Sequence, residues 1–95
     1  MKGAHDVIIR PIISEKSYTL LDNNKYTFEV HPKAHKTQVR KAVEEIFNVK
    51  VRDVQTLVVH GKVKRMGAFQ GKRPDWKKAV VTLEEGQSID LFEQV

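Results

Sequence analysis

Two β-rich runs late in the chain constrain the fold most strongly, because the first of them would be longer as a strand than the diameter of a compact domain of this size. Residues 49–65 are VKVRDVQTLVVHGKVKR, and residues 76–83 are WKKAVVTL. At ~3.3 Å per residue, the part from Val51 to Lys64 would span on the order of 45 Å. A compact domain of this length has a radius of gyration of only ~12 Å, hence a diameter near ~32 Å. We therefore expect two antiparallel strands whose connection, at about residues 62–77, protrudes from a single domain formed by residues 1–95.

The segment between these strands, from His60 to Lys78, is strongly basic. It holds seven bases against one acid, Asp75, for a net charge of +6, whereas the whole chain carries +5. The bases are Lys62, Lys64, Arg65, Lys72, Arg73, Lys77 and Lys78. Gly61, Gly67 and Gly71 lie among them, and glycine allows close approach of two backbones. Such a segment predicts a polyanionic partner, with nucleic acid favoured over an acidic membrane surface.

Two aromatic side chains within the basic segment favour RNA over a bare run of charge. Phe69 and Trp76 offer planes on which an unpaired base can stack. Arg65 and Arg73 can each form two hydrogen bonds with phosphate oxygens. The simpler alternative is a solvated, positively charged hairpin tip. Phe69 and Trp76 are also suited to capping the hydrophobic core, so both assignments stay open.

The first part of the chain predicts a strand, a helix and a second strand. Asp6–Arg10 is a short β-branched run ended by Pro11, which suits an edge strand. Ser14 is a good N-cap for a short helix over Ser14–Leu21. Lys25–Val30 alternates strictly, so one face of a half-buried strand carries the apolar residues. Those residues are Tyr26, Phe28 and Val30.

The main helix is predicted over Lys36–Phe47. Its buried stripe, at spacings of three and four, consists of Val39, Ala42, Val43 and Ile46. His35 is the expected N-cap, with Gln38 as half of a capping box, and Asn48 suits a left-handed residue after the helix. After the last strand, the tail is expected to lie back on the body through Ile89, Leu91 and Phe92.

Charges on this helix oppose its dipole. Lys36, Arg40 and Lys41 lie in the first half, and Glu44 and Glu45 lie in the last turns. The expected pairs Arg40–Glu44 and Lys41–Glu45 offset part of this cost. One explanation is that the helix start faces a phosphate. A solvated charged face is the equally open alternative.

No enzyme, metal or cofactor site is evident in the sequence. The chain has no cysteine, and its four histidines are scattered. Its glycines match no phosphate-binding motif, and no acids are placed for acid–base catalysis. No apolar run approaches the roughly 18 residues of a membrane helix, and no signal peptide is apparent. We predict a cytosolic protein without catalysis, cofactor or membrane insertion.

Three stretches together resemble a known family. They are IIRPIISEKS, NKYTFEVHPKAHKTQVRKAVEEIFNVKV and TLVVHGKVKRMGAFQGKRPDWKKAVVTLEEGQSIDLF. They resemble the bacterial form of large-subunit ribosomal protein twenty-three over nearly the whole chain. The resemblance implies an α+β fold of order β-α-β-α-β-β. In it, helices pack on an antiparallel sheet, with a long basic hairpin extension between the last two strands. One departure is His35, where relatives often have Thr, a better N-cap.

The same resemblance implies a function and partners. It implies binding to large-subunit ribosomal RNA beside the peptide exit tunnel, with the extended loop near the nascent chain. It also implies neighbouring ribosomal proteins as partners, a place in the cytoplasmic ribosome and no need for a homo-oligomer. The RNA-binding residues predicted from residues and resemblance together are Lys33, Lys36, Thr37, Arg40, Lys62, Lys64, Arg65, Gly67, Phe69, Gly71, Lys72, Arg73, Trp76, Lys77 and Lys78.

A second predicted site is the tripeptide Ser14, Glu15 and Lys16. The resemblance places it where the family docks trigger factor and the signal recognition particle. From the residues alone, Glu15 is only an acid in the first turn of a helix, where the dipole favours it.

Two other binding functions fit the charge less well. A nucleic-acid-binding regulator outside the ribosome would need a recognition helix with base-reading side chains, and none is evident. A membrane-surface protein would need an amphipathic basic helix, whereas these bases lie on a ribbon interrupted by glycine.

Overall fold

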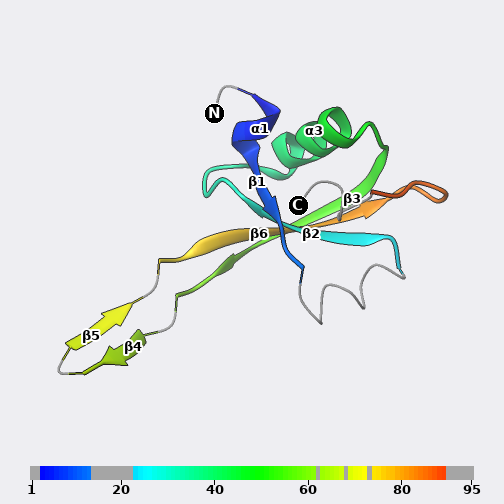
Figure 1. Cartoon of the computed structure of the whole chain (residues 1–95). Helices are drawn as coiled ribbons and strands as arrows, with labels where there is room; N and C mark the ends of the chain where they lie inside the picture. Colours follow the sequence, from blue (N-terminus) through cyan, green and yellow to red (C-terminus); the bar gives the residue numbers. More distant parts are fainter. Residues whose placement is uncertain (1–2, 14–22, 62, 68, 73, 90–95) are drawn as a thin grey trace.

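The fold is α+β, with a four-stranded antiparallel sheet covered on one face by two helices (Figure 1). The computed structural model describes residues 3–13, 23–61, 63–67, 69–72 and 74–89, and only the backbone at 63–66, 69, 70 and 72. The elements are α1 (Ala4–Val7), β1 (Ile8–Pro11), β2 (Lys25–Val30), α3 (Lys36–Phe47), β3 (Val51–Val59), β4 (Val63–Met66), β5 (Phe69–Lys72) and β6 (Trp76–Leu83). The main sheet has the order β1-β2-β6-β3, and β4 and β5 form a separate pair. The predicted class, an α+β fold with helices packed on an antiparallel sheet, is confirmed.

The start of the chain differs from its prediction. Instead of a strand from Asp6, one helical turn, α1, precedes the strand, and the Asp6 N–H donates to the Gly3 carbonyl at 3.0 Å. Val7 is buried at the end of this turn, and its carbonyl accepts from the His31 N–H at 2.9 Å. Burial of Val7 against the rest of the chain therefore outweighs the local preference for strand. The strand itself runs from Ile8, and its edge position is as predicted.

The predicted main helix and the strand before it are confirmed at both ends. The Gln38 side chain accepts from the His35 N–H at 2.9 Å, which is the expected half of the capping box. Asn48 has φ 53° and ψ 50°, the left-handed conformation that ends a helix. Of the predicted stripe, Ile46 is only partly buried at the rim of the core. The predicted helix over Ser14–Leu21 lies outside the described residues.

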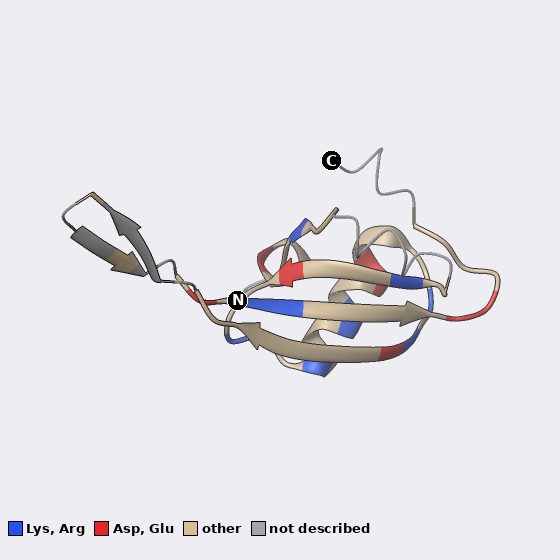
Figure 2. Ribbon diagram, turned by 90° about the horizontal axis from the view of Figure 1, so that it is seen from below, with Lys and Arg blue, Asp and Glu red and all other residues tan. Residues whose placement is uncertain are grey.

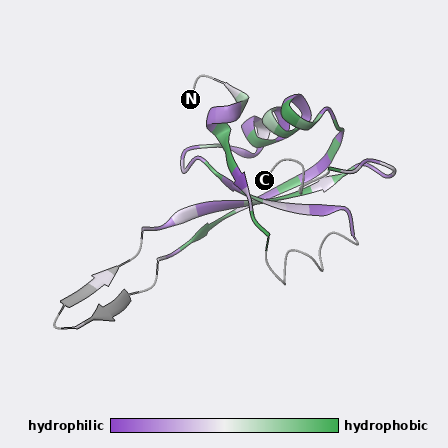
Figure 3. Ribbon diagram, viewed as in Figure 1, coloured by the Kyte–Doolittle hydropathy of each residue, from purple (hydrophilic) through white to green (hydrophobic). Residues whose placement is uncertain are grey.

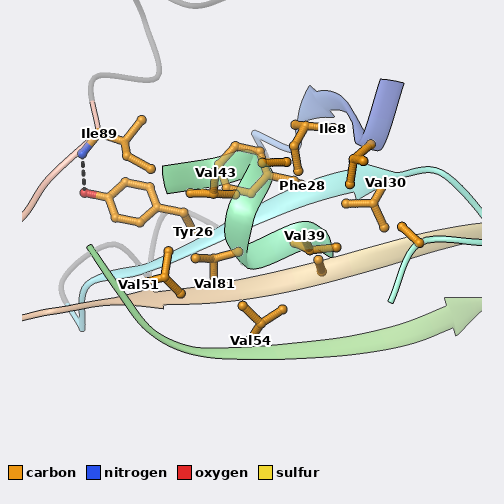
Figure 4. Close-up of a cluster of buried hydrophobic side chains, with 14 of the residues drawn as sticks. Ile8, Tyr26, Phe28, Val30, Val39, Val43, Val51, Val54, Val81 and Ile89 are labelled. Carbon is orange, nitrogen blue, oxygen red and sulfur yellow. Dashed lines mark hydrogen bonds between the residues drawn. The ribbon is translucent and has the colours of Figure 1, made fainter. Parts of the chain in front are cut away.

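The core lies between α3 and the sheet (Figure 4). Phe28 is fully buried, with its ring centroid 5.5 Å from that of Phe47. Thr27, on the opposite face of β2, is also buried, so this strand is covered on both faces there. Ile89 is buried as predicted, and its N–H donates to the Tyr26 hydroxyl at 3.2 Å. The other two tail residues, at 91 and 92, lie outside the described residues.

The long strand predicted from residue 49 to residue 65 is interrupted. β3 ends at Val59, opposite Trp76, and β4 begins at Val63, opposite Lys72. Val63 lies four residues after Val59, and Lys72 lies four residues before Trp76. The pairing register is therefore the same on both sides of the gap. The β4–β5 ribbon therefore continues the β3–β6 hairpin without a bulge. It ends in a tight turn after Met66 in which Gly67 has φ 63°, a conformation that suits glycine.

A carboxylate bridges the gap between the two ladders. The Gly61 N–H donates to Asp75 Oδ1 at 2.7 Å, and His60 Nδ1 lies 3.3 Å from Asp75 Oδ2. Pro74, beside it, has no N–H to offer a ladder. The break between β3 and β4 thus has a local cause, the Asp75 carboxylate and Pro74, which the estimate from strand length did not consider.

The ribbon lies beyond the ends of β3 and β6 (Figure 1). The principal-axis extents are 52 × 31 × 22 Å, so the molecule is much longer in one direction than in the others. The structure does not describe the Lys and Arg side chains of the ribbon. The basic surface of the ribbon therefore stays a prediction.

Candidate nucleic-acid interface

A basic cleft of about 210 Å³ lies between the start of α3 and the start of β3. We call it the α3–β3 cleft. Its lining residues are Lys36, Thr37, Arg40, Arg52, Asp53 and Val54. Three bases and one acid leave it with a net positive charge, which suits an anionic group.

Helical periodicity places the first three of these residues on one side of α3. Thr37 and Arg40 follow Lys36 by one and four residues, and all three are exposed. Val39 and Val43 lie on the adjoining side of the helix and are fully buried in the core. The same periodicity that buries the apolar stripe therefore turns these polar side chains toward the cleft, beside the N-terminal end of a 12-residue helix.

Arg40 and Glu44 do not form the predicted ion pair. Arg40 Nη2 donates to the Val51 carbonyl at 2.7 Å, and Glu44 Oε2 accepts from the Val51 N–H at 3.1 Å. Val51 begins an edge strand, so its outward backbone groups need partners, and these two side chains supply both. The predicted pair Lys41–Glu45 is also absent from the ion pairs of the described residues. Arg40 is thereby held at the cleft by one N–H, and its other donors have no partner among the described residues.

Arg52 belongs to the cleft and was not predicted. Val51 and Val54 are both buried, although a regular strand would put residues three apart on opposite faces. The register shifts between Val51 and Asp53, so a β-bulge adds one residue there and re-aims the strand. The spacing of the two valines is the sequence signal that could have revealed this bulge. Among the described residues, neither Lys36 nor Arg52 has an ion-pair partner within 4.0 Å.

Lys33 and Lys77 both lie beside the turn that precedes α3. Lys33 is exposed, and its N–H donates to His31 Nδ1 at 3.0 Å. Lys77 is partly buried, and its Nζ donates to the Ala34 carbonyl at 2.6 Å. The Lys77 ammonium thus links β6 to this turn, which is a structural role that the sequence did not reveal.

Trp76 and Lys78 lie on the opposite face of β6 from Lys77, because side chains alternate along a strand. Both are partly buried. Figure 2 shows the sheet from the side away from the helices, with basic residues at the start of β6. The structure therefore separates the predicted RNA-binding residues of the body into three groups, at the α3–β3 cleft, at the turn before α3 and on this face of β6.

The remaining predicted RNA-binding residues lie on the ribbon or outside the described part of the chain. Gly67 is exposed at the tip, and Gly71 pairs with Lys64 in the β4–β5 ladder. The predicted binding side chains that lie outside the description are Lys62, Lys64, Arg65, Phe69, Lys72 and Arg73. The docking tripeptide at 14–16 also lies outside the described residues.

No other kind of site emerges from the described part of the chain. Its His, Asp and Glu side chains form no group of three or more that could hold a metal ion. None of its helices is long and apolar enough to cross a membrane.

Comparison with known proteins gives a consistent family. Residues 6–91 match the family described as ribosomal protein L23. The chain is 53% identical over 95 residues to large ribosomal subunit protein uL23 of Heliobacterium modesticaldum, covering 100% of both chains. It is 56% identical over 91 residues to that of Roseiflexus castenholzii, covering 96% of this chain and 97% of the relative. For Thermus thermophilus the identity is 55% over 93 residues, with 98% and 97% covered. The predicted resemblance is confirmed, and the chain belongs to the ribosomal protein L23 family, whose members are structural, non-enzymatic components of the large subunit of the cytoplasmic ribosome.

Proposed function

We propose that this chain binds large-subunit ribosomal RNA beside the peptide exit tunnel. The α3–β3 cleft is the contact on the body, and the protruding basic ribbon at residues 62–77 is the second contact. The observation that carries the proposal is the cleft itself. Lys36 and Arg40 of α3 and Arg52 of β3, from two consecutive elements, converge on one hollow at a helix N-terminus.

The chemistry of the cleft suits phosphate more than base edges. Lys36 and Arg52 carry charge without a protein ion-pair partner among the described residues, so they are free to neutralise a phosphate. The Thr37 hydroxyl and the first N–H groups of α3 add donors for phosphate oxygens. Contacts of this kind position a protein on RNA without reading its sequence. The position beside the exit tunnel is supported by family membership and by the resemblance of the ribbon motif.

Replacement of single cleft cations tests this assignment. Lys36→Gln and Arg52→Gln should each weaken binding to large-subunit RNA. Each should also lower the slope of log K against log salt by roughly 0.7–0.9, the value for one lost phosphate contact. The measurement is a salt titration of binding to purified ribosomal RNA.

Lys41→Gln is the matched control for the cleft variants. Lys41 is exposed on the same helix but lines a different hollow, between α1 and α3. We expect its slope to equal that of the wild type. If all three variants behave alike, the cleft is not the RNA contact.

We further propose that the tripeptide Ser14, Glu15 and Lys16 helps to form the docking site for trigger factor and the signal recognition particle. Family resemblance supports the assignment. The adjacent Ile13, which follows the edge strand β1, is 40% exposed, and Ile9 within β1 is 52% exposed. Apolar side chains exposed beside a charged tripeptide suit a protein interface.

Glu15→Ala should weaken trigger factor binding to ribosomes while incorporation of the chain into the large subunit stays normal. The physical reason is loss of a charged hydrogen-bond acceptor at the interface. Glu45→Ala, at an exposed acid on α3, is the control and should leave trigger factor affinity unchanged. Equal affinities for all three ribosome preparations would exclude Glu15 from the docking site.

A further inference from the structure

The outer edge of β3 has no partner strand among the described residues. The sheet order β1-β2-β6-β3 leaves β3, a strand of nine residues, paired on one side only. An edge of this kind presents a row of backbone N–H and C=O groups. Which residues carry those groups can be worked out from the neighbouring strands.

The backbone bonds of β6 show which groups of β3 point outward. The Leu83 N–H donates to the Asn24 carbonyl at 3.0 Å, on the β2 side of β6. Because bonding direction alternates along an antiparallel strand, every second residue of β6 bonds to β2 and the others bond to β3. Gln55 and Leu57 each lie opposite a residue of β6 that bonds to β3. The backbone N–H and C=O groups of Gln55 and Leu57 therefore point toward β6. The outward backbone groups therefore belong to Val54, Thr56 and Val58.

Helix α3 covers only the first position of this edge. Val51 also points its backbone outward, and both its groups are bonded, to Arg40 and Glu44. Beyond the bulge, no described residue bonds to the outward N–H or C=O of the three residues that follow. Three donors and three acceptors thus remain along one stretch from Val54 to Val58.

The two edges of the sheet contrast sharply in their protection. β1, at the other edge, is four residues long, contains Pro11, and has Arg10 paired with Glu29 at 2.7 Å. These are features that prevent further strand pairing. β3 has charge only near its start, and the rest of the strand is uncharged (Figure 2).

Exposed apolar side chains accompany the free backbone of β3. Leu57 is 43% exposed and Val58 is 52% exposed, and as neighbours on a strand they lie on opposite faces of the sheet. The end of β3 toward the ribbon is correspondingly hydrophobic (Figure 3). An added strand would therefore find apolar contacts on both of its faces.

We propose that the outer edge of β3, from Val54 to Val58, receives an extended segment of a neighbouring protein of the large subunit as an additional strand. A row of alternating donors and acceptors is complementary to another main chain. The stretch has no Lys or Arg to neutralise phosphates, which disfavours RNA as the occupant. The proposal rests on family membership and not on RNA binding by the cleft, because the cleft meets this edge only at Val54, and Leu57 and Val58 are not among its lining residues.

Two substitutions at Val58 separate backbone pairing from side-chain packing. Val58→Pro removes an outward N–H, a position at which edge strands tolerate proline. Val58→Thr keeps the N–H and nearly the same shape. In competition with wild-type chain for incorporation into large subunits, we expect Val58→Pro to lose by about fivefold or more, the equivalent of one net backbone hydrogen bond. Val58→Thr should compete nearly as well as the wild type.

Amide NMR spectra of the free variants establish that each is folded before the competition is read. Incorporation of Val58→Pro at the wild-type level would overturn the proposal. Equal losses for Val58→Pro and Val58→Thr would also overturn it, because side-chain packing alone would then explain the contact.

A photo-reactive amino acid at Leu57 identifies the occupant in purified large subunits. A cross-link to a defined extended segment of another ribosomal protein supports strand addition. A nucleotide adduct, a cross-link between two copies of this chain, or no cross-link at all overturns it. Lys36→Gln and Arg52→Gln should not change the cross-link, so failure of the RNA proposal and failure of this one are distinguishable.

Discussion

Lys77 shows how a single residue changes role between sequence and structure. In the sequence it is one of seven bases in a basic segment. In the structure its ammonium donates to the carbonyl of the fully buried Ala34, at 2.6 Å, across the space between β6 and the turn before α3. A carbonyl in that position would otherwise lose its hydrogen bond, so this lysine contributes to the stability of the body.

Replacing Lys77 by Met should therefore destabilise the chain. We expect a loss of about 1–2 kcal/mol in the free energy of unfolding, because a buried carbonyl loses a charged donor. For a chain of this size each kcal/mol corresponds to roughly 4–8 °C in Tm, so thermal unfolding followed by circular dichroism will detect it.

Lys78→Met is the control, because Lys78 lies on the opposite face of the same strand. It should leave the free energy of unfolding within about 0.5 kcal/mol of the wild-type value, as is usual for substitutions away from such features. Equal Tm values for the two variants would show that the bond to Ala34 contributes nothing to stability.

At the scale of elements, α3 was predictable and β3 was only partly so. The helix is specified by apolar spacing, a half capping box at Gln38 and a left-handed residue at Asn48, all within one stretch of sequence. The ends of β3 depend on other parts of the chain. Val51 is fixed by two side chains of α3, and the break after Val59 coincides with the Asp75 carboxylate, 14 residues after Gly61.

The turn at α1 and the bulge at Arg52 have the same origin. In both places the backbone departs from a regular strand so that a valine, Val7 or Val54, can be buried against α3 and the rest of the core. Hydrophobic periodicity indicates that such residues are buried, but it does not show how the backbone must bend to bury them. This is why the place of Arg52 in the cleft, beside the predicted residues of α3, emerged only from the structure.

At the scale of the whole molecule, charge is concentrated where the chain extends from its body. The segment from His60 to Lys78 carries +6, so the remainder carries a net charge close to zero. The ribbon keeps the register of β3 and β6 and adds no contact that the main sheet needs. Its removal should therefore affect binding far more than folding.

Deletion of Arg65 to Pro74 tests this separation. The deletion removes three bases, so the salt slope of ribosomal RNA binding should fall by roughly two to three, in addition to a loss of affinity. Unfolding of the free chain should stay cooperative, because the β3–β6 ladder ends at the pair of Val59 and Trp76, outside the deletion. Unchanged affinity and slope would contradict the proposed role of the ribbon.

The sequence by itself determined the fold class, the family, the main helix and the existence of a basic segment between two long strands. Each of these depends on local periodicity, on capping residues or on motifs that lie together along the chain. Only the tertiary structure decided that Arg40 holds Val51, that Lys77 turns inward, that a bulge brings Arg52 to the cleft, and that the edge of β3 from Val54 to Val58 is open. The physical reason is that all four depend on how the sheet and the helix pack together, because that packing sets which apolar side chains are buried and which backbone groups find a partner.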